Sequence, residues 1–87
     1  MEVSFSSSFK RAFKKRIKNK PDLEERFWQK LEQFTIEPFE PSLQTHKLSG
    51  KLKDLWSYTI GYDVQVVFYF SEQKAIFVDI GSHDEVY

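Results

Sequence analysis

The chain has 87 residues, of which 40% are hydrophobic and 17% aromatic, and it contains no cysteine. This length predicts one domain over residues 1–87 and excludes a multidomain enzyme, while the apolar content argues against intrinsic disorder. The lack of cysteine excludes a disulfide framework and a zinc knuckle. No apolar run reaches the ~20 residues of a membrane span, so we expect a cytoplasmic protein that does not bind membranes.

The formal net charge is zero, but the charges are unevenly distributed along the chain. Residues 1–20 carry seven basic side chains and one acidic one, whereas residues 21–87 carry six basic and twelve acidic side chains. A basic N-terminal segment suits a polyanion such as RNA, and it equally suits an acidic protein partner.

Apolar residues at helical spacing predict two antiparallel helices in the first half of the chain. In the first helix, which follows capping candidates at serines 6–8, the apolar stripe is Phe5, Phe9, Phe13 and Ile17. In the second helix, which Pro21 opens, the stripe is Leu23, Phe27, Leu31 and Phe34. Like charges at i,i+4 spacing on the first helix, such as Lys10 and Lys14, weaken an isolated helix. We therefore expect an external partner for this basic face.

Runs rich in β-branched and aromatic residues predict strands in the second half. Residues 55–60, 64–70 and 75–80 are separated by short polar segments and form a predicted antiparallel meander. Residues 2–5 could add a further strand. The predicted fold class is α+β, with an N-terminal helical hairpin packed on a small antiparallel β-sheet.

The order of these segments resembles the RelE/ParE superfamily of bacterial toxins, closest to its YafQ-like and RelE-like ribonuclease branch. The most specific parts are an H-x-L-x-G-x-x-K stretch from His46 to Lys53, a GYD turn before an aromatic-rich strand, and a terminal G-x-H-x-x-x-aromatic. The resemblance covers nearly the whole chain and implies a RelE-like toxin domain. It also implies a metal-independent endoribonuclease, without a cofactor, that cleaves messenger RNA in the ribosomal A site. Its partner would be a cognate antitoxin encoded next to it.

Metal-free RNA cleavage by the ribose 2′-OH needs a base, an acid and groups that stabilise charge on the phosphate. The resemblance places His46, Asp63 and His83 at catalytic positions of the family. Our hypothesis makes His83 the general acid and His46 or Asp63 the base, since histidine titrates near neutral pH. Tyr87, the last residue, would stack on a base or orient the phosphate.

Further residues are candidates for holding RNA or its phosphates. The predicted set is Lys51, Lys53, Thr59, Gln65, Lys10 and Lys14. Two of them depart from the family pattern, because Thr59 stands where YafQ-type toxins have a histidine and Gln65 where RelE-type toxins have an arginine. Lys51 and Lys53 could supply the missing cation.

Each candidate also has a purely structural explanation. His46 could be a solvated loop residue, Asp63 could simply form the turn, and Tyr87 could be a packing residue. A metal site built from both histidines, Asp63 and Asp84 lacks tight ligand spacing. Two other functions stay open: a gyrase-poisoning toxin of the ParE kind, and a catalytically decayed member that only binds its antitoxin.

Overall fold

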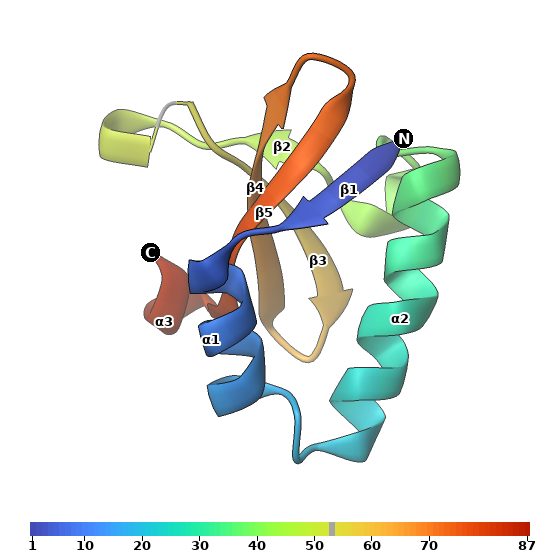
Figure 1. The fold of residues 1–87 in the computed structure, drawn as a ribbon, viewed down its shortest axis with the longest axis vertical. Coiled ribbons are helices and arrows are strands. Elements are labelled where there is room, and N and C mark those ends of the chain that lie inside the picture. The colour runs from blue at the N-terminus through green and yellow to red at the C-terminus, as the bar shows by residue number, and fades with distance from the viewer. Residues whose placement is uncertain (53) are drawn as a thin grey trace.

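The chain folds into a five-stranded sheet with two helices packed against one face (Figure 1). The computed structural model describes residues 1–52 and 54–87. The elements in chain order are β1 (Glu2–Phe5), α1 (Ser7–Arg16), α2 (Pro21–Ile36), the 3-10 helix η1 (Pro41–Leu43), β2 (His46–Lys47), the 3-10 helix η2 (Gly50–Leu52), β3 (Trp56–Gly61), β4 (Val64–Ser71), β5 (Lys74–Ser82) and α3 (His83–Val86). The predicted α+β class is confirmed.

The strand order is β1-β5-β4-β3-β2. Strands β3, β4 and β5 form the predicted antiparallel meander, and β2 adds an antiparallel edge. Strand β1 pairs with β5 in parallel, so the sheet is mixed and the prediction of a purely antiparallel sheet is wrong at this edge. Both helices and three strands lie between β1 and β5 in the chain, and such a long connection is compatible with parallel pairing, which a tight turn is not.

A single residue, Ser6, separates the end of β1 from the start of α1. Ser6 is its N-cap, and the Ser6 hydroxyl accepts a hydrogen bond from the backbone N–H of Phe9 at 3.1 Å. Phe5 therefore belongs to β1 and not to the helix, which corrects the predicted stripe. Its ring still stacks on Phe9, with centroids 4.9 Å apart, because strand and helix meet at this corner.

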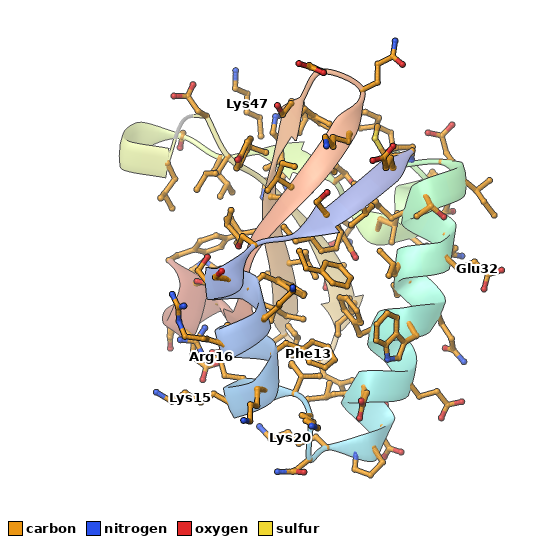
Figure 2. The ribbon with its side chains drawn as sticks, in the orientation of Figure 1. Phe13, Lys15, Arg16, Lys20, Glu32 and Lys47 are labelled. Atoms are coloured by element: carbon orange, nitrogen blue, oxygen red, sulfur yellow. The ribbon has the colours of Figure 1, made fainter. Side chains whose placement is uncertain are left out.

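The two predicted helices form a hairpin whose phenylalanines fill the space above the sheet. Figure 2 shows Phe13 pointing from α1 toward α2, where its ring lies 5.1 Å from that of Phe27. The largest buried rings of the core are Phe9, Phe27, Phe34, Tyr58, Phe68 and Phe77. The Tyr58 hydroxyl has no hydrogen-bond partner among the described residues, and burial raises the pKa of this group.

Alternation along the strands gives the sheet two different faces. Residues such as Tyr58 and Val66 pack into the core beneath the helices. Their neighbours on the opposite side form what we call the outer face, which consists of Ser57, Thr59, Gln65 and Val67. Figure 1 shows α3 and the C-terminus on the side of the sheet away from α2. Within the described ranges, no helix is long and apolar enough to cross a membrane.

Candidate functional site

The last five residues bring two of the predicted site residues into contact. His83 and Tyr87 are four positions apart, which places them on one side of the short helix α3. Their ring centroids lie 4.5 Å apart and the planes are nearly perpendicular, at 86°. The His83 side chain is 63% exposed and Tyr87 is 42% exposed. An imidazole and an aromatic ring are thus presented together to solvent.

A capping box starts helix α3 and fixes the backbone that carries these rings. The Ser82 hydroxyl accepts from the Glu85 backbone N–H at 3.3 Å, and the Ser82 backbone N–H donates to the Glu85 carboxylate at 2.7 Å. The segment Ser82–Glu85 has the S-x-x-E pattern that is typical of a helix N-terminus. This pattern is local, so the sequence itself carries the signal for the start of α3.

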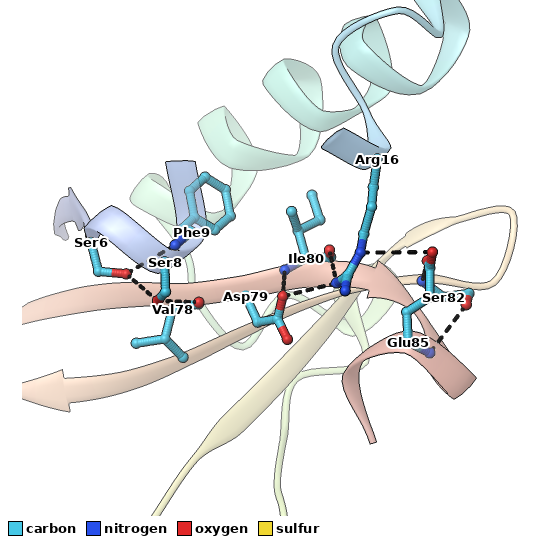
Figure 3. A network of polar contacts seen from close by, with 9 residues as sticks. All are labelled: Ser6, Ser8, Phe9, Arg16, Val78, Asp79, Ile80, Ser82 and Glu85. Atoms are coloured by element: carbon cyan, nitrogen blue, oxygen red, sulfur yellow. Dashed lines mark hydrogen bonds and ion pairs between the residues drawn. The ribbon is translucent and has the colours of Figure 1, made fainter. Parts of the chain in front are cut away.

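Arg16, near the end of α1, connects this corner to the rest of the fold (Figure 3). Its Nη1 donates to the Asp79 carboxylate and to the Ile80 carbonyl, both at 3.0 Å. Its Nε lies 3.7 Å from the Glu85 carboxylate. In the sequence Arg16 is one basic residue among several, because partners 63 and more positions away leave no local signal.

The Glu85 carboxylate, which accepts the hydrogen bond from the Ser82 backbone N–H, is held in its charged form. The Ser82 backbone N–H, followed by the Ser82 hydroxyl and the Arg16 charge, lowers the pKa of Glu85 below its ordinary value of 4.5. The carboxylate is therefore ionised at neutral pH, when it anchors the first turn of α3.

Asp63 occupies the two-residue turn between β3 and β4. Tyr62 and Asp63 both have left-handed backbone angles, with φ of 54° and 60°, which is the geometry of a tight hairpin turn. The turn-forming explanation of Asp63 is thereby confirmed, and its side chain is still exposed. Because Val64 pairs with Ser82, Asp63 and His83 each lie one residue beyond paired positions, at the same end of neighbouring strands.

His46 lies on strand β2, opposite Ser57 and therefore on the outer face. Its Nδ1 donates to the Gln44 carbonyl at 2.8 Å, which leaves Nε2 free to accept a proton when the ring is neutral. Two strands separate β2 from β5, a span of about 14 Å in the sheet plane. Across the described part of the chain, no hydrogen bond, ion pair or ring contact joins His46 to His83.

Thr59 and Gln65 face each other on the outer face, and each has a local partner. The Thr59 hydroxyl donates to the Val64 carbonyl at 3.3 Å and accepts from the Gly61 backbone N–H at 3.0 Å. A phosphate would therefore compete with Val64 for the Thr59 proton. The Gln65 Oε1 accepts a hydrogen bond from the Ser57 hydroxyl at 3.0 Å. A phosphate would therefore bind to the N–H groups of the Gln65 amide, which are donors.

The predicted lysines within the described residues lie in two separate parts of the molecule. Lys10 and Lys14 line a groove between α1 and α2, on the helical side of the molecule. Lys51 lies in η2, and Figure 1 shows this segment projecting from the same side of the sheet as α3. Lys53 lies outside the described residues.

Comparison of the sequence with models of known protein families identifies the family of this chain. Residues 1–87 match the family model described as the bacterial toxin of type II toxin-antitoxin systems, YafQ. The chain belongs to the YafQ toxin family. The resemblance noted from the sequence is thus confirmed, over the whole chain. No curated protein matches this YafQ-family chain.

Solved structures of toxins share its fold. A metal-bound toxin from Helicobacter pylori is 27% identical, with 100% of this chain and 99% of that chain covered and a TM-score of 0.79. YafQ from Escherichia coli is 15% identical, with 99% and 97% covered and a TM-score of 0.77. The Escherichia coli DinJ-YafQ complex is 17% identical, with 99% and 97% covered and a TM-score of 0.73.

The Helicobacter pylori toxin holds a metal, which raises the question of whether this YafQ-family chain has a matching ligand set. In residues 1–52 and 54–87, no three His, Asp or Glu side chains are grouped to hold an ion. His83 has one carboxylate nearby, that of Asp84, at 3.8 Å. The described residues therefore do not form a metal centre of three ligands.

Proposed function

We propose that this YafQ-family toxin is a metal-independent endoribonuclease that cleaves messenger RNA at the ribosome, in the bacterial cytoplasm. The observation that supports this most directly is the exposed pair of His83 and Tyr87, in ring contact on a helix anchored at its first turn. A proton donor beside an aromatic ring combines proton transfer with base stacking, which are two separate needs of an RNA-cleaving site.

In the proposed reaction the ribose 2′-oxygen loses its proton to a base and attacks the adjacent phosphorus. The bond from phosphorus to the 5′-oxygen breaks, and His83 gives its proton to that oxygen. The products are a 2′,3′-cyclic phosphate and a free 5′-hydroxyl, so atoms and charges balance without a cofactor. Tyr87 would stack on a neighbouring base, which is worth ~1–3 kcal/mol.

Either Asp63 or His46 would take the proton from the 2′-OH. The strand register supports Asp63, because its turn lies at the same sheet end as His83. The Nε2 left free by the bond from Nδ1 supports His46, which lies on the edge strand β2. His46→Ala and Asp63→Ala distinguish the two candidates, because only loss of the residue that acts as the base should abolish cleavage.

Lysines and polar side chains would hold the phosphates in this proposal. Lys51 and Lys53 would supply positive charge, and the amide of Gln65 would donate to a phosphate oxygen. The Thr59 hydroxyl would contribute only by giving up its bond to Val64. Lys10 and Lys14 would add to the long-range positive field that attracts RNA.

A cognate antitoxin is the proposed protein partner. Support comes from the family of the chain and from the similar fold of YafQ in the DinJ-YafQ complex. The antitoxin would silence the toxin until it is removed.

The test is induced expression in bacteria, followed by growth measurement and primer extension on messenger RNA. We expect growth arrest and new RNA 5′ ends, and we expect His83→Ala or deletion of Tyr87 to abolish both while circular dichroism and antitoxin binding stay unchanged. Glu32→Ala is the control, because the Glu32 side chain is exposed on α2, away from α3. Unchanged toxicity in both site variants would refute the assignment.

The same expression experiment separates the other functions. Growth arrest without new RNA ends, together with trapped gyrase cleavage complexes in a topoisomerase assay, would show a ParE-like poison instead. Normal growth of cells that express the unpartnered wild-type chain would show a decayed member.

A further inference from the structure

The turn between β3 and β4, which carries Asp63, is anchored by a side chain of α2. The Arg26 Nε donates a hydrogen bond at 2.6 Å to the carbonyl of Ile60, which lies just before the turn. Figure 1 shows the turn beside the N-terminal half of α2, from which Arg26 comes. Hydrogen bonds from charged donors are shorter and stronger than neutral ones. The contact joins segments 34 positions apart, so it restrains the turn from outside the hairpin.

A β-bulge makes the Ile60 carbonyl available to Arg26. In the pairing of β3 with β4 the register shifts between Thr59 and Gly61, so Ile60 is the extra residue of β3. A bulge disrupts the ladder of hydrogen bonds locally, and buried backbone groups in that position need another partner. Arg26 is that partner for the Ile60 carbonyl.

Gly61 lets the guanidinium approach the backbone closely. Its φ is 95°, an angle that residues with a Cβ rarely adopt. A Cβ added at Gly61 would lie 2.7 Å from the Arg26 Nε. The glycine therefore serves both the backbone angle and the space that Arg26 occupies, immediately before the two turn residues.

The two turn residues have a backbone conformation that is unfavourable for their side chains. Tyr62 and Asp63 have φ of 54° and 60°, a region in which a bulky residue such as tyrosine is rare. The Tyr62 ring is 70% exposed, so the core does not hold it in place. The Arg26 guanidinium lies 5.3 Å from the centroid of this ring, as a cation–π contact. Because sparsely populated angles persist only where the surrounding structure imposes them, this contact supports the turn.

We propose that Arg26 is a positioning residue for Asp63, because it holds the turn through the Ile60 carbonyl and the Tyr62 ring. The turn lies at the same end of the sheet as His83. This proposal rests on the proposed function in taking Asp63 as the group that removes the proton from the ribose 2′-OH. That proton must lie within hydrogen-bond distance of the base, and a misplacement of about 1 Å can cost about 100-fold in rate.

The first test compares Arg26→Gln with Lys30→Gln, which removes the same charge four residues further along α2. The Lys30 Nζ bonds to Gln33 and Ser42, away from the turn. The substrate is a messenger RNA bound to purified ribosomes, with toxin in excess. We expect Arg26→Gln to lower the rate at saturating toxin about tenfold or more, while the half-saturating concentration changes less than about threefold. A rate that falls equally in both variants, or in neither, would overturn the proposal.

Nuclear magnetic resonance of the free toxin reports on the turn itself. We expect the order parameters of the Tyr62 and Asp63 amides to be near about 0.85 in the wild type and in Lys30→Gln, and below about 0.6 in Arg26→Gln. Urea unfolding checks that each variant is folded. Unchanged order parameters in Arg26→Gln would overturn the proposal, and so would a mobile turn combined with a wild-type cleavage rate.

A second-site substitution separates positioning of the turn from direct contact between Arg26 and RNA. Asparagine is the usual residue at the first position of such a turn, so Tyr62→Asn should keep the turn in place without the guanidinium. We therefore expect Arg26→Gln/Tyr62→Asn to recover most of the rate that Arg26→Gln loses. Failure of this double variant to recover any rate would assign Arg26 a direct contact with RNA and overturn the proposal.

The dependence on Asp63 has its own measurement. If Arg26 acts through Asp63, then Arg26→Gln should lower the residual rate of Asp63→Asn less than about threefold. A tenfold effect in that background, or a wild-type rate in Asp63→Asn itself, would contradict the proposal. If the wild-type toxin cleaves no RNA while the order parameters still fall in Arg26→Gln, the nuclease function fails and the anchoring of the turn by Arg26 stands.

Discussion

Arg16 of α1 and Asp79 of β5 form an ion pair at 3.0 Å, and the same guanidinium reaches the Glu85 carboxylate at 3.7 Å. The N-terminal basic helix is therefore tied to the C-terminal helix that carries His83 and Tyr87. Arg16 contacts none of the proposed reacting groups directly, so it acts as a positioning residue. Its contribution is to hold Glu85 and, through it, the start of α3.

Arg16→Gln should impair catalysis more than it impairs folding. Loss of the hydrogen bonds to Asp79 and Ile80 should lower the free energy of unfolding by about 1 kcal/mol. The released α3 should lower kcat for RNA cleavage about tenfold or more, because small misplacements of catalytic groups have large effects. Arg11→Gln, an exposed position on the same helix, is the control for charge. An Arg16 variant with wild-type kcat would show that the ion pair is only structural.

Gly81→Ala should disturb the same corner by steric means. A Cβ added at Gly81 would lie 2.9 Å from both the Arg16 Nη1 and the Glu85 Oε1, so the two side chains would have to move apart. We expect a loss of about 1 kcal/mol in the free energy of unfolding, because the flexible ends of the two side chains can move but give up their hydrogen bonds when they do. Urea unfolding measures it.

A double-mutant cycle tests whether the two changes act on one contact. In the Arg16→Gln background one of the two close contacts of the added methyl group is removed, so Gly81→Ala should cost less there than in the wild type. Costs that simply add would mean that Gly81 acts independently of Arg16.

The helix α3 should loosen in acid. The pKa of Glu85 is lowered in the folded protein, so its contribution to stability is present above its unfolded value of 4.5 and is lost as the pH falls through the lower folded value. The nuclear Overhauser contact between the His83 and Tyr87 rings should therefore persist at neutral pH and weaken below about pH 4.5. In Glu85→Gln the contact should already be weak at neutral pH. A contact with the same acid dependence in both proteins would contradict this role of Glu85.

Tyr58→Phe should stabilise the fold or leave it unchanged. The Tyr58 side chain is fully buried against Phe34 and Phe68, and its hydroxyl has no partner among the described residues. Removing an unsatisfied buried hydroxyl while keeping the ring should add up to about 1–3 kcal/mol. Urea unfolding at neutral pH measures the change. A loss of stability would show that the hydroxyl has a partner in solution.

Local sequence patterns predicted most of the helices and strands of the fold. The four-residue spacing of phenylalanines predicted both helices, and alternating β-branched and aromatic runs predicted β3, β4 and β5 near their observed bounds. Phe5 was misassigned because a stripe at helical spacing continues into the strand before the cap at Ser6. The parallel pairing of β1 depends on the path of the whole chain, which no local pattern encodes.

The candidate site was less predictable for the same reason. The spacing of His83 and Tyr87 within one helical turn is local, and their contact follows from it. The pairing of Arg16 with Asp79 joins residues 63 positions apart and requires the finished fold. The division of the α1 lysines between two surfaces likewise depends on where α2 packs, so the sequence alone could not separate Lys10 and Lys14 from Lys15.

Cleavage of a defined messenger RNA bound to purified ribosomes, with and without a single 2′-deoxy substitution at the cut site, tests the central claim about the toxin most directly. The unmodified RNA should yield a 2′,3′-cyclic phosphate and a 5′-hydroxyl, and the deoxy substrate should stay intact at that position. His83→Ala should leave both substrates intact. Equal cleavage of the deoxy substrate, or 5′-phosphate products, would contradict attack by the ribose 2′-OH and with it the proposed roles of His83, His46 and Asp63.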